Sequence, residues 1–264
     1  KKINEVEKNF SNWPRSHGGY SSMRFSSLDI INKTNVKKLE VAWTFNSGDG
    51  KKGMQANPVV YDGLVYFPTP GNNIICLDGK SGKEIWRYKA KKGYNVAKRG
   101  LLIWNDKKNN IVKLFFTNDD QLISLDAKTG LPINNFGKNG IIKIGSSPIP
   151  PVIIKNQLIV ATFRPSVEVY DVYSGKLLWK YFLREKKGSD FNGGNPWGGM
   201  SADIKKGIVY LTTGNPKPNF VGVTRPGKNL FANSIVAIDI KNQKKLWHFQ
   251  ETCHDIWNHD IPST

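Results

Sequence analysis

The sequence has little that would indicate a membrane span, a disulfide scaffold or a cysteine metal site. It has two cysteines, Cys76 and Cys253, in 264 residues. No run of about 18 apolar residues occurs, which argues against a membrane-spanning helix. The cysteines are far apart and neither belongs to a CxxC pair, so we expect no metal site from them and an inert, buried thiol at Cys76. A disulfide between the two stays open at this point.

Acidic residues are also scarce, with 21 Asp and Glu against 39 Lys and Arg and a formal charge of +18. Such an excess is typical of proteins that bind nucleic acids or anionic membranes. However, 32 of the cations are Lys and only 7 are Arg, and pairs such as Lys37-Lys38 and Lys107-Lys108 are scattered along the chain. Base readout and bidentate phosphate contacts favour Arg. We interpret the charge as solvated surface lysines and expect no specific nucleic-acid partner.

Aromatic and apolar residues are plentiful, and they form a repeat. Four segments share an apolar strand that ends in Asp, a turn with Gly four residues later, and a short return strand usually closed by Trp. The aspartates Asp78, Asp126, Asp171 and Asp239 are 48, 45 and 68 residues apart. A further strand pair precedes several of these hairpins, at 59–67, 152–162 and 200–213. Four strands in a repeat of about 45 residues is typical of a propeller blade.

The turn chemistry supports this interpretation. The Asp carboxylate can accept hydrogen bonds from turn amides, Gly supplies a positive φ, and Trp on the return strand can pack between neighbouring sheets. The sequence therefore predicts an all-β fold, a β-propeller of four-stranded antiparallel blades with about four blades present. We expect no helix beyond a weak turn near Val36–Leu39.

The repeat is broken in three places. The second copy has Asn134 where Trp is expected and Pro132 within the return strand, which demotes that strand to an edge or a loop. The fourth copy has Gln243 in place of Gly. The longest interval carries additional residues, mainly in Gly193–Trp197 and Pro216–Asn233. Insertions between blade strands collect on one face, where propellers place their sites.

Three ordered sets of residues resemble the pyrroloquinoline quinone (PQQ) dependent dehydrogenases, the quinoprotein alcohol and glucose dehydrogenase family. The resemblance covers essentially the whole chain. The sets are Trp13-Pro14 to Ser26 and Ile31–Leu39 with Ala42-Trp43; Lys98–Trp104; and Gly194–Asp203 continuing through Thr213–Pro216, Arg225–Leu230 and Ser234–Ala237 to Trp247–Gln250 and His254–Trp257. The resemblance implies a PQQ cofactor and a Ca²⁺ ion.

The resemblance assigns three residues to the cofactor. Trp197 would be the floor on which the planar quinone stacks, although packing between blades is the alternative. Arg99 would donate to the quinone oxygens and stabilise the charge that builds there on reduction, with an ordinary surface arginine as the alternative. Gln55 falls where the family places an acidic or amide contact to the cofactor, and a blade-edge amide is the alternative.

Asn215 matches a Ca²⁺ ligand of the alcohol-oxidising members. One amide oxygen cannot hold the ion, so PQQ and carboxylates would complete its shell. The family's acidic ligand loop is shortened here to Ala161–Ser166 and has no Glu at the expected place, while Glu168 lies in the adjacent strand pattern.

The position of the family's catalytic aspartate is occupied by Asn258. An amide cannot take a proton from a substrate hydroxyl, so either Asp255 or Asp260 replaces it, or the chain is not a competent dehydrogenase. The adjacent cysteines of the alcohol dehydrogenases are replaced by Gly93-Tyr94-Asn95, which moves the resemblance toward the glucose-dehydrogenase-like branch.

Family propellers have eight blades, so four repeats amount to half of one. We expect residues 1–264 to form a single partial propeller domain, with an amino-terminal signature and closing strand in 1–43 and about four blades in 44–264. The chain would be a fragment, a truncated product or a half that needs a second half-propeller chain.

The functional hypothesis is an enzyme that oxidises alcohols or sugars by hydride transfer to PQQ. It would be periplasmic, possibly membrane-associated, and its export signal is absent from this chain. Electrons would pass to a cytochrome or a membrane quinone. The alternative is a non-catalytic propeller scaffold or binding protein built from the same repeat. The substitution at Asn258 and the shortened loop favour that alternative, whereas Trp197, Arg99 and Asn215 favour the enzyme.

Overall fold

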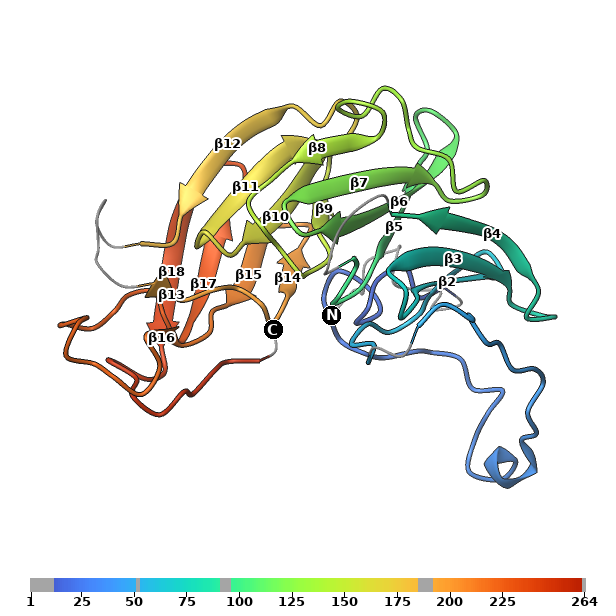
Figure 1. Cartoon of the computed structure of the whole chain (residues 1–264), viewed down its shortest axis with the longest axis horizontal. Helices are drawn as coiled ribbons and strands as arrows, with labels where there is room; N and C mark the ends of the chain where they lie inside the picture. The colour runs from blue at the N-terminus through green and yellow to red at the C-terminus, as the bar shows by residue number, and fades with distance from the viewer. Residues whose placement is uncertain (1–11, 51–52, 91–95, 185–191, 263–264) are drawn as a thin grey trace.

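The computed structural model describes residues 12–50, 53–90, 96–184 and 192–262. These residues form four four-stranded antiparallel sheets, one small two-stranded sheet and one 3-10 helix, η1 (Val36–Lys38). The four sheets stand side by side around an arc (Figure 1), as blades do in a propeller. The predicted all-β blade architecture is therefore confirmed. The described residues include no helix whose length and hydropathy would let it span a bilayer. Gly93-Tyr94-Asn95 lie outside the described residues.

Each of the first three blades is a simple meander of consecutive strands. Blade 1 contains β1 (Val59–Tyr61), β2 (Leu64–Pro68), β3 (Asn73–Asp78) and β4 (Glu84–Lys89); blade 2 contains β5 (Leu102–Asp106), β6 (Ile111–Asn118), β7 (Gln121–Asp126) and β8 (Ile141–Lys143); blade 3 contains β9 (Val152–Ile154), β10 (Gln157–Thr162), β11 (Ser166–Asp171) and β12 (Leu177–Phe182).

Blade 4 is interrupted by an excursion. It contains β14 (Met200–Asp203), β15 (Ile208–Thr212), β17 (Ser234–Asp239) and β18 (Lys244–Gln250). The short strands β13 (Asn192–Gly193) and β16 (Pro216–Lys217) leave the blade and pair with each other. The two insertions noted in the sequence are thereby joined beside blade 4.

The Asp-to-Gly turns close the outer hairpins as expected. In blade 1, Asp78 Oδ1 accepts a hydrogen bond of 2.7 Å from the Ser81 N–H, and the Gly82 N–H donates to the Asp78 carbonyl at 2.8 Å. Gly82 has φ +70°, which an L side chain adopts only with strain. Gln243, at the matching position of blade 4, has φ +55° and carries that strain.

Two Trp side chains dock on the turn of the blade that follows them, Trp43 on blade 1 and Trp86 on blade 2. The Trp43 Nε1–H donates to the Gly79 carbonyl, and the Trp86 Nε1–H donates to the Ala127 carbonyl, each at 3.0 Å. A Cβ on Gly130 would lie 2.6 Å from the Trp86 ring, and one on Gly82 equally near Trp43. Each indole therefore needs a glycine in the turn beneath it.

The joint after blade 2 is built differently because that blade lacks the Trp. Pro132 makes only an isolated bridge to Leu125, and the outer strand β8 does not begin until Ile141. Phe136 and Ile142 instead approach Gly175 of blade 3. The break in the return strand expected at Pro132 is confirmed. Phe136 and Ile142, which lie farther along the chain, supply the apolar contact between blades 2 and 3 that the missing Trp would make.

Residues 12–24, which we name the crossing segment, run along the inner strands of all four blades. This segment connects blades that are otherwise joined only through neighbour contacts. Its hydrogen bonds are Trp13 N–H to Val60 O at 2.7 Å, Ile103 N–H to Pro14 O at 2.7 Å, Arg15 Nε–H to Pro151 O at 3.3 Å and Ala202 N–H to Tyr20 O at 2.8 Å.

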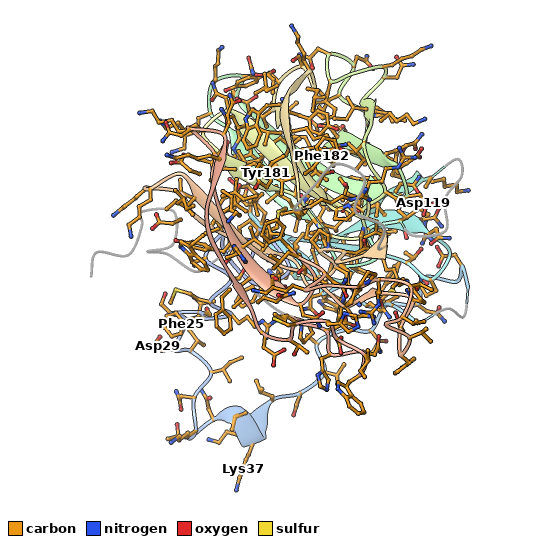
Figure 2. All side chains as sticks on the ribbon, turned by 90° about the vertical axis from the view of Figure 1, so that its left-hand side faces the viewer. Phe25, Asp29, Lys37, Asp119, Tyr181 and Phe182 are labelled. Carbon is orange, nitrogen blue, oxygen red and sulfur yellow. The ribbon has the colours of Figure 1, made fainter. Side chains whose placement is uncertain are left out.

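Beyond the crossing segment an arm leaves the blades. Figure 2 shows Phe25, Asp29 and Lys37 on this arm, which extends away from the sheets and carries η1. The helical turn expected near Val36 is confirmed. The described residues 25–50 contain no strand, yet Trp43 returns to dock on blade 1. A closing strand within 1–43 stays a prediction. Both cysteines are free thiols, with Cys76 buried and Cys253 exposed.

Candidate functional site

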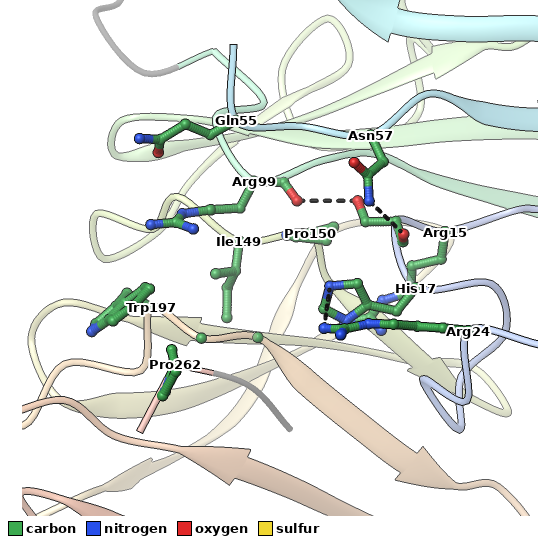
Figure 3. A pocket seen from close by; sticks show the side chains of 13 residues that line it. Arg15, His17, Arg24, Gln55, Asn57, Arg99, Ile149, Pro150, Trp197 and Pro262 are labelled. Carbon is green, nitrogen blue, oxygen red and sulfur yellow. Dashed lines mark hydrogen bonds between the residues drawn. The ribbon is translucent and has the colours of Figure 1, made fainter. Parts of the chain in front are cut away.

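Two adjoining cavities lie where the crossing segment meets the inner ends of the blades. The first, of about 160 Å³, is lined by Arg15, His17, Arg24, Gln55, Arg99 and Trp197 among others. The second, of about 230 Å³, is lined by Lys98, Ser146, Ser147 and Phe163, and it shares Arg99 and Trp197 with the first. In Figure 3, Trp197 and Arg99 stand at one end of the first cavity and His17 and Arg24 at the other. The three residues assigned to the cofactor thus line one cavity.

Arg99 lies over the face of Trp197. Its guanidinium carbon is 4.7 Å from the centroid of the indole ring, which is a cation–π contact. The backbone of Arg99 is fixed on two sides, because its N–H donates to Pro148 O at 2.9 Å and its carbonyl accepts from Ser16 Oγ at 3.0 Å. Gly100 follows with φ +128°, and a Cβ there would collide with Ser16 Oγ. The local backbone therefore presents Arg99 to the cavity rather than to the rim.

Trp197 is held by the insertion that precedes β14. Its N–H and that of Gly214 both donate to the Asn195 carbonyl, at 2.9 and 3.0 Å. A Cβ on Gly198 would lie 2.6 Å from Thr212 Oγ1 and 2.8 Å from the Pro262 backbone. The glycine after the Trp lets the insertion pass between β15 and the carboxyl-terminal segment. Trp197 makes no blade-to-blade joint of the kind formed by Trp43 and Trp86.

Asn215 and Asp260 meet Trp197 around Gly214. The Asn215 N–H donates to Asp260 Oδ1 at 2.8 Å. A Cβ on Gly214 would lie 2.4 Å from that same carboxylate oxygen and 2.7 Å from Trp197 Nε1. Two residues from distant parts of the sequence, Trp197 and Asp260, therefore converge on Gly214, and any side chain there would displace them.

Asn258 is connected to this cluster through a chain of amides. Asn215 Nδ2 donates to Asn219 Oδ1 at 2.6 Å, and Asn219 Nδ2 donates to Asn258 Oδ1 at 2.9 Å. Asn258 itself is exposed and has φ +64°, a conformation that Asn tolerates better than most residues. Sequence reasoning missed Asn219, which lies inside the insertion and matches no repeat position.

Asp255 occupies a different environment. It is only 2% exposed, and its carboxylate accepts from the N–H groups of Trp257 at 2.7 Å and His259 at 2.8 Å and from Asn233 Nδ2 at 3.1 Å. The buried Arg225 donates to the Asp255 carbonyl at 2.5 Å. These bonds anchor the carboxyl-terminal segment, whereas Asp260 lies beside Trp197.

Acidic residues do not gather into a metal site in the described part of the chain, where no group of three or more His, Cys, Asp or Glu side chains could hold an ion. Glu168 is buried in blade 3 and accepts from Gly145 N–H, Tyr170 Oη and Lys180 Nζ. Burial alone would raise the pKa of Glu168, but these hydrogen bonds together hold it below its ordinary value. Glu168 is thus fully engaged away from Asn215.

Among the described residues that line the first cavity, the charged side chains are arginines, and none is Asp or Glu. Burial, followed by the charges of Arg24 and Arg15, lowers the pKa of His17 to about 4, so the ring is neutral near pH 7. Arg15 and His17 were not among the site residues expected from the sequence. The available signal was a pair of basic residues close to the Gly18-Gly19 turn and outside the blade repeat.

Comparisons with known proteins agree with this architecture. Residues 13–264 match the family described as PQQ: glucose/ethanol/alcohol dehydrogenase, beta-propeller domain. Quinoprotein glucose dehydrogenase A of Acinetobacter calcoaceticus is 30% identical over 96% of this chain and 39% of its own length. Quinohemoprotein alcohol dehydrogenase ADH IIB of Pseudomonas putida is 32% identical over 92% of this chain and 40% of its own length.

Among solved structures, quinohemoprotein alcohol dehydrogenase from Comamonas testosteroni superposes with a TM-score of 0.81 at 27% identity, over 98% of this chain and 44% of that one. The chain thus spans about two fifths of the length of the curated relatives it matches. The match over almost every described residue, together with the four blades, places the chain in the PQQ-dependent glucose, ethanol and alcohol dehydrogenase β-propeller family.

Proposed function

We propose that this chain supplies the quinone-binding part of a PQQ-dependent dehydrogenase that oxidises alcohols or sugars. The observation that carries the proposal is the pairing of Trp197 and Arg99 on the shared wall of two cavities. An indole face offers a stacking surface for a planar ring system, and a guanidinium offers fixed donors to its oxygens. The residues present fit a flat, anionic cofactor.

The chain's own groups would bind and orient the cofactor. The guanidinium of Arg99, which covers the indole of Trp197 in this structure, would move to the edge of the bound ring and donate to its oxygens there. Trp197 would then support one face of the ring, and the amide of Gln55 lines the same cavity. A positive side chain at that edge also stabilises negative charge that builds during reduction. When bound, PQQ supplies the acceptor for a hydride taken from the substrate carbon.

Asp260 is the residue we propose for removing the substrate hydroxyl proton. It lies beside Trp197 and keeps one carboxylate oxygen bonded to the Asn215 N–H. A carboxylate can accept a proton, which the amide of Asn258 cannot. Asp255 has the same chemistry, but its oxygens already accept from three donors in a buried setting. Asn258 would instead help to position Asn219 and Asn215.

The described side chains do not form a complete Ca²⁺ site. Asn215 carries one amide oxygen, and Asp260, which accepts from the Asn215 backbone N–H, carries one carboxylate, whereas the ion takes about 6–8 oxygen ligands. The described side chains alone therefore do not fit a calcium shell, and the cofactor or residues outside this chain would have to complete it.

We extend the proposal to the whole protein by family membership. Residues 1–264 would be one partial propeller domain, and the remaining blades, in a longer chain or in a second half-propeller chain, would complete the ring. The substrate would be a small alcohol or sugar, the electron acceptor a cytochrome or membrane quinone, and the location the periplasm, either soluble or membrane-associated.

Calorimetric titration of the chain with PQQ tests the proposal, with Trp197→Phe and Trp197→Ala as site variants. Trp247→Phe is the matched control, since Trp247 is 46% exposed on the outer strand β18. We expect PQQ to bind more weakly to the two Trp197 variants and equally well to Trp247→Phe. Once the propeller ring is complete, we expect alcohols or sugars to reduce a dye in the presence of the protein. Absence of PQQ binding to the unaltered chain would favour the non-catalytic scaffold instead.

A further inference from the structure

A third cavity lies between blades 1 and 2, away from Trp197. Its volume is about 630 Å³, and we name it the interblade cavity. One wall is formed by Tyr88 and Lys89 at the end of β4, and the other by β7, β8 and the loop between them. None of its described lining residues lines either of the two cavities beside Trp197. Ligand sites in proteins commonly enclose about 300–1,000 Å³, so a small molecule fits this space.

The interblade cavity follows from the broken repeat of blade 2. In blade 1 the outer strand comes directly after the hairpin turn, whereas in blade 2 it begins only at Ile141. Within the loop that precedes it, the ring of Phe136 packs against Gly175 of blade 3. The side of the loop that faces blade 1 carries Pro132 instead. The loop therefore gives its large apolar side chain to the joint with blade 3, and the space beside Tyr88 stays open.

Tyr88 gives the interblade cavity a fixed aromatic wall. The centroid of its ring lies 5.9 Å from that of Phe116, and the two ring planes meet at 68°, an edge-to-face contact that holds the orientation of the Tyr88 ring. The surface behind it is apolar, because Ile123 is buried and both Ile141 and Tyr88 pack against the same core. A rigid aromatic face above an apolar floor suits a flat apolar ring.

Two lysines place positive charge at the edge of this apolar space. Lys89 follows Tyr88 on β4 and Lys138 lies in the loop before β8, so the two come from opposite walls. Both are exposed, and neither takes part in an ion pair within the described residues. The described lining residues include no Asp or Glu. Positive charge at the edge of an apolar cavity favours an apolar molecule that carries a negative group.

We propose that the interblade cavity binds a small aromatic carboxylate, with its ring against Tyr88 and its acid group between Lys89 and Lys138. The ring loses water on entering apolar walls, whereas the carboxylate stays at the exposed edge and keeps much of its hydration. The lysines act as point charges and not as bidentate clamps, so the ring supplies most of the affinity and the charge supplies selectivity. This site is independent of the proposed function, because it uses no residue of the cavities beside Trp197.

Calorimetric titration of the full chain with 2-naphthoate tests the charged edge, and 2-naphthamide is the matched uncharged probe. We expect the acid to bind more tightly than the amide. Lys89→Gln and Lys138→Gln should each weaken naphthoate binding about two- to fivefold, the range of an exposed ion pair, and leave naphthamide binding unchanged. Lys128→Gln is the control, since it removes one charge from an exposed turn of blade 2.

Tyr88→Leu tests the aromatic wall, with Tyr181→Leu as the matched control. Tyr181 stands in the same place on the outer strand of blade 3, two residues after the repeat Trp, and packs against the core shared by blades 3 and 4. Tyr88→Leu should weaken the binding of both probes about three- to tenfold, and Tyr181→Leu should change neither. Circular dichroism confirms that each variant is folded.

Trp197→Ala separates this proposal from the proposed function. Naphthoate binding that depends on Tyr88 and the two lysines, and is unchanged in Trp197→Ala, supports the interblade site whether or not the chain binds PQQ. Naphthoate binding that is lost in Trp197→Ala would assign the probe to the other cavities and overturn this proposal. Equal binding of acid and amide, equal losses in Tyr88→Leu and Tyr181→Leu, or no saturable binding to the unaltered chain would overturn it as well.

Discussion

Replacing Gln243 by Gly should stabilise the protein through the joint between blades 3 and 4. The indole of Trp179 packs against the core that contains Ile240, but its Nε1–H is buried without a hydrogen-bond partner. At the two preceding Trp joints, the indole donates to the carbonyl one residue after the turn Asp, and glycine lies beneath the ring. Ile240 is the equivalent acceptor, and Gln243 stands where that glycine is required.

Two effects of the Gln243→Gly substitution raise the free energy of unfolding, and one lowers it. Relief of the positive φ at Gln243 is worth about 1–2 kcal/mol, and satisfying a buried N–H is worth about 1–3 kcal/mol. The additional chain entropy of glycine in the unfolded state costs about 0.5–1 kcal/mol. The net gain is about 1–4.5 kcal/mol in the free energy of unfolding, and at about 2–4 °C per kcal/mol the melting temperature should rise by several degrees.

Thermal unfolding followed by circular dichroism measures this gain. Lys155→Gly is the matched control, because Lys155 also has φ +55° but lies in the β9–β10 turn, away from any Trp joint. Gln243→Gly should exceed the control by the value of the indole hydrogen bond, and the excess should vanish when Trp179 is replaced by Phe. Equal gains in Gln243→Gly and Lys155→Gly would refute the joint as the cause.

Three further predictions concern the site. Gly214→Ala should weaken PQQ binding about tenfold or more by displacing Asp260 and Trp197, with titration calorimetry as the measurement. Asp255→Asn should lower the free energy of unfolding by about 1–3 kcal/mol. Asp260→Asn should leave that free energy unchanged and abolish turnover of the completed enzyme. The reverse pattern would assign the catalytic role to Asp255 and the structural role to Asp260. The folded-state pKa of His17, about 4, is below its ordinary 6.5, so its contribution to stability is complete above pH 6.5 and is lost as the pH falls toward 4. His17→Asn should flatten that part of the stability profile in denaturant melts.

The blades could be predicted from the sequence because their determinants are local. An Asp, a Gly four residues later and a Trp on the return strand specify turn, reversal and packing within one hairpin, and all three recur at Asp78 and Asp171. The interruption at Pro132 was also readable, since proline removes a ladder donor. The place where β8 resumes was not, because Phe136 and Ile142 are selected by contact with Gly175 of another blade.

The site was only partly predictable because its members come from distant segments. Sequence could not rank Asp255 against Asp260, which differ in burial and in the donors that surround them. The contribution of Arg15 and His17 depends on the path of the crossing segment beneath four blades, and no local pattern encodes that path. Glu168 lies in the strand pattern beside the shortened loop, and its partners Tyr170 and Lys180 could not be inferred from that pattern.

The most direct test of the central claim is a crystal structure of the chain grown with PQQ. The account predicts the quinone against the face of Trp197, with Arg99 at its edge. Density for PQQ elsewhere on the blades, with Arg99 still covering the indole, would contradict it.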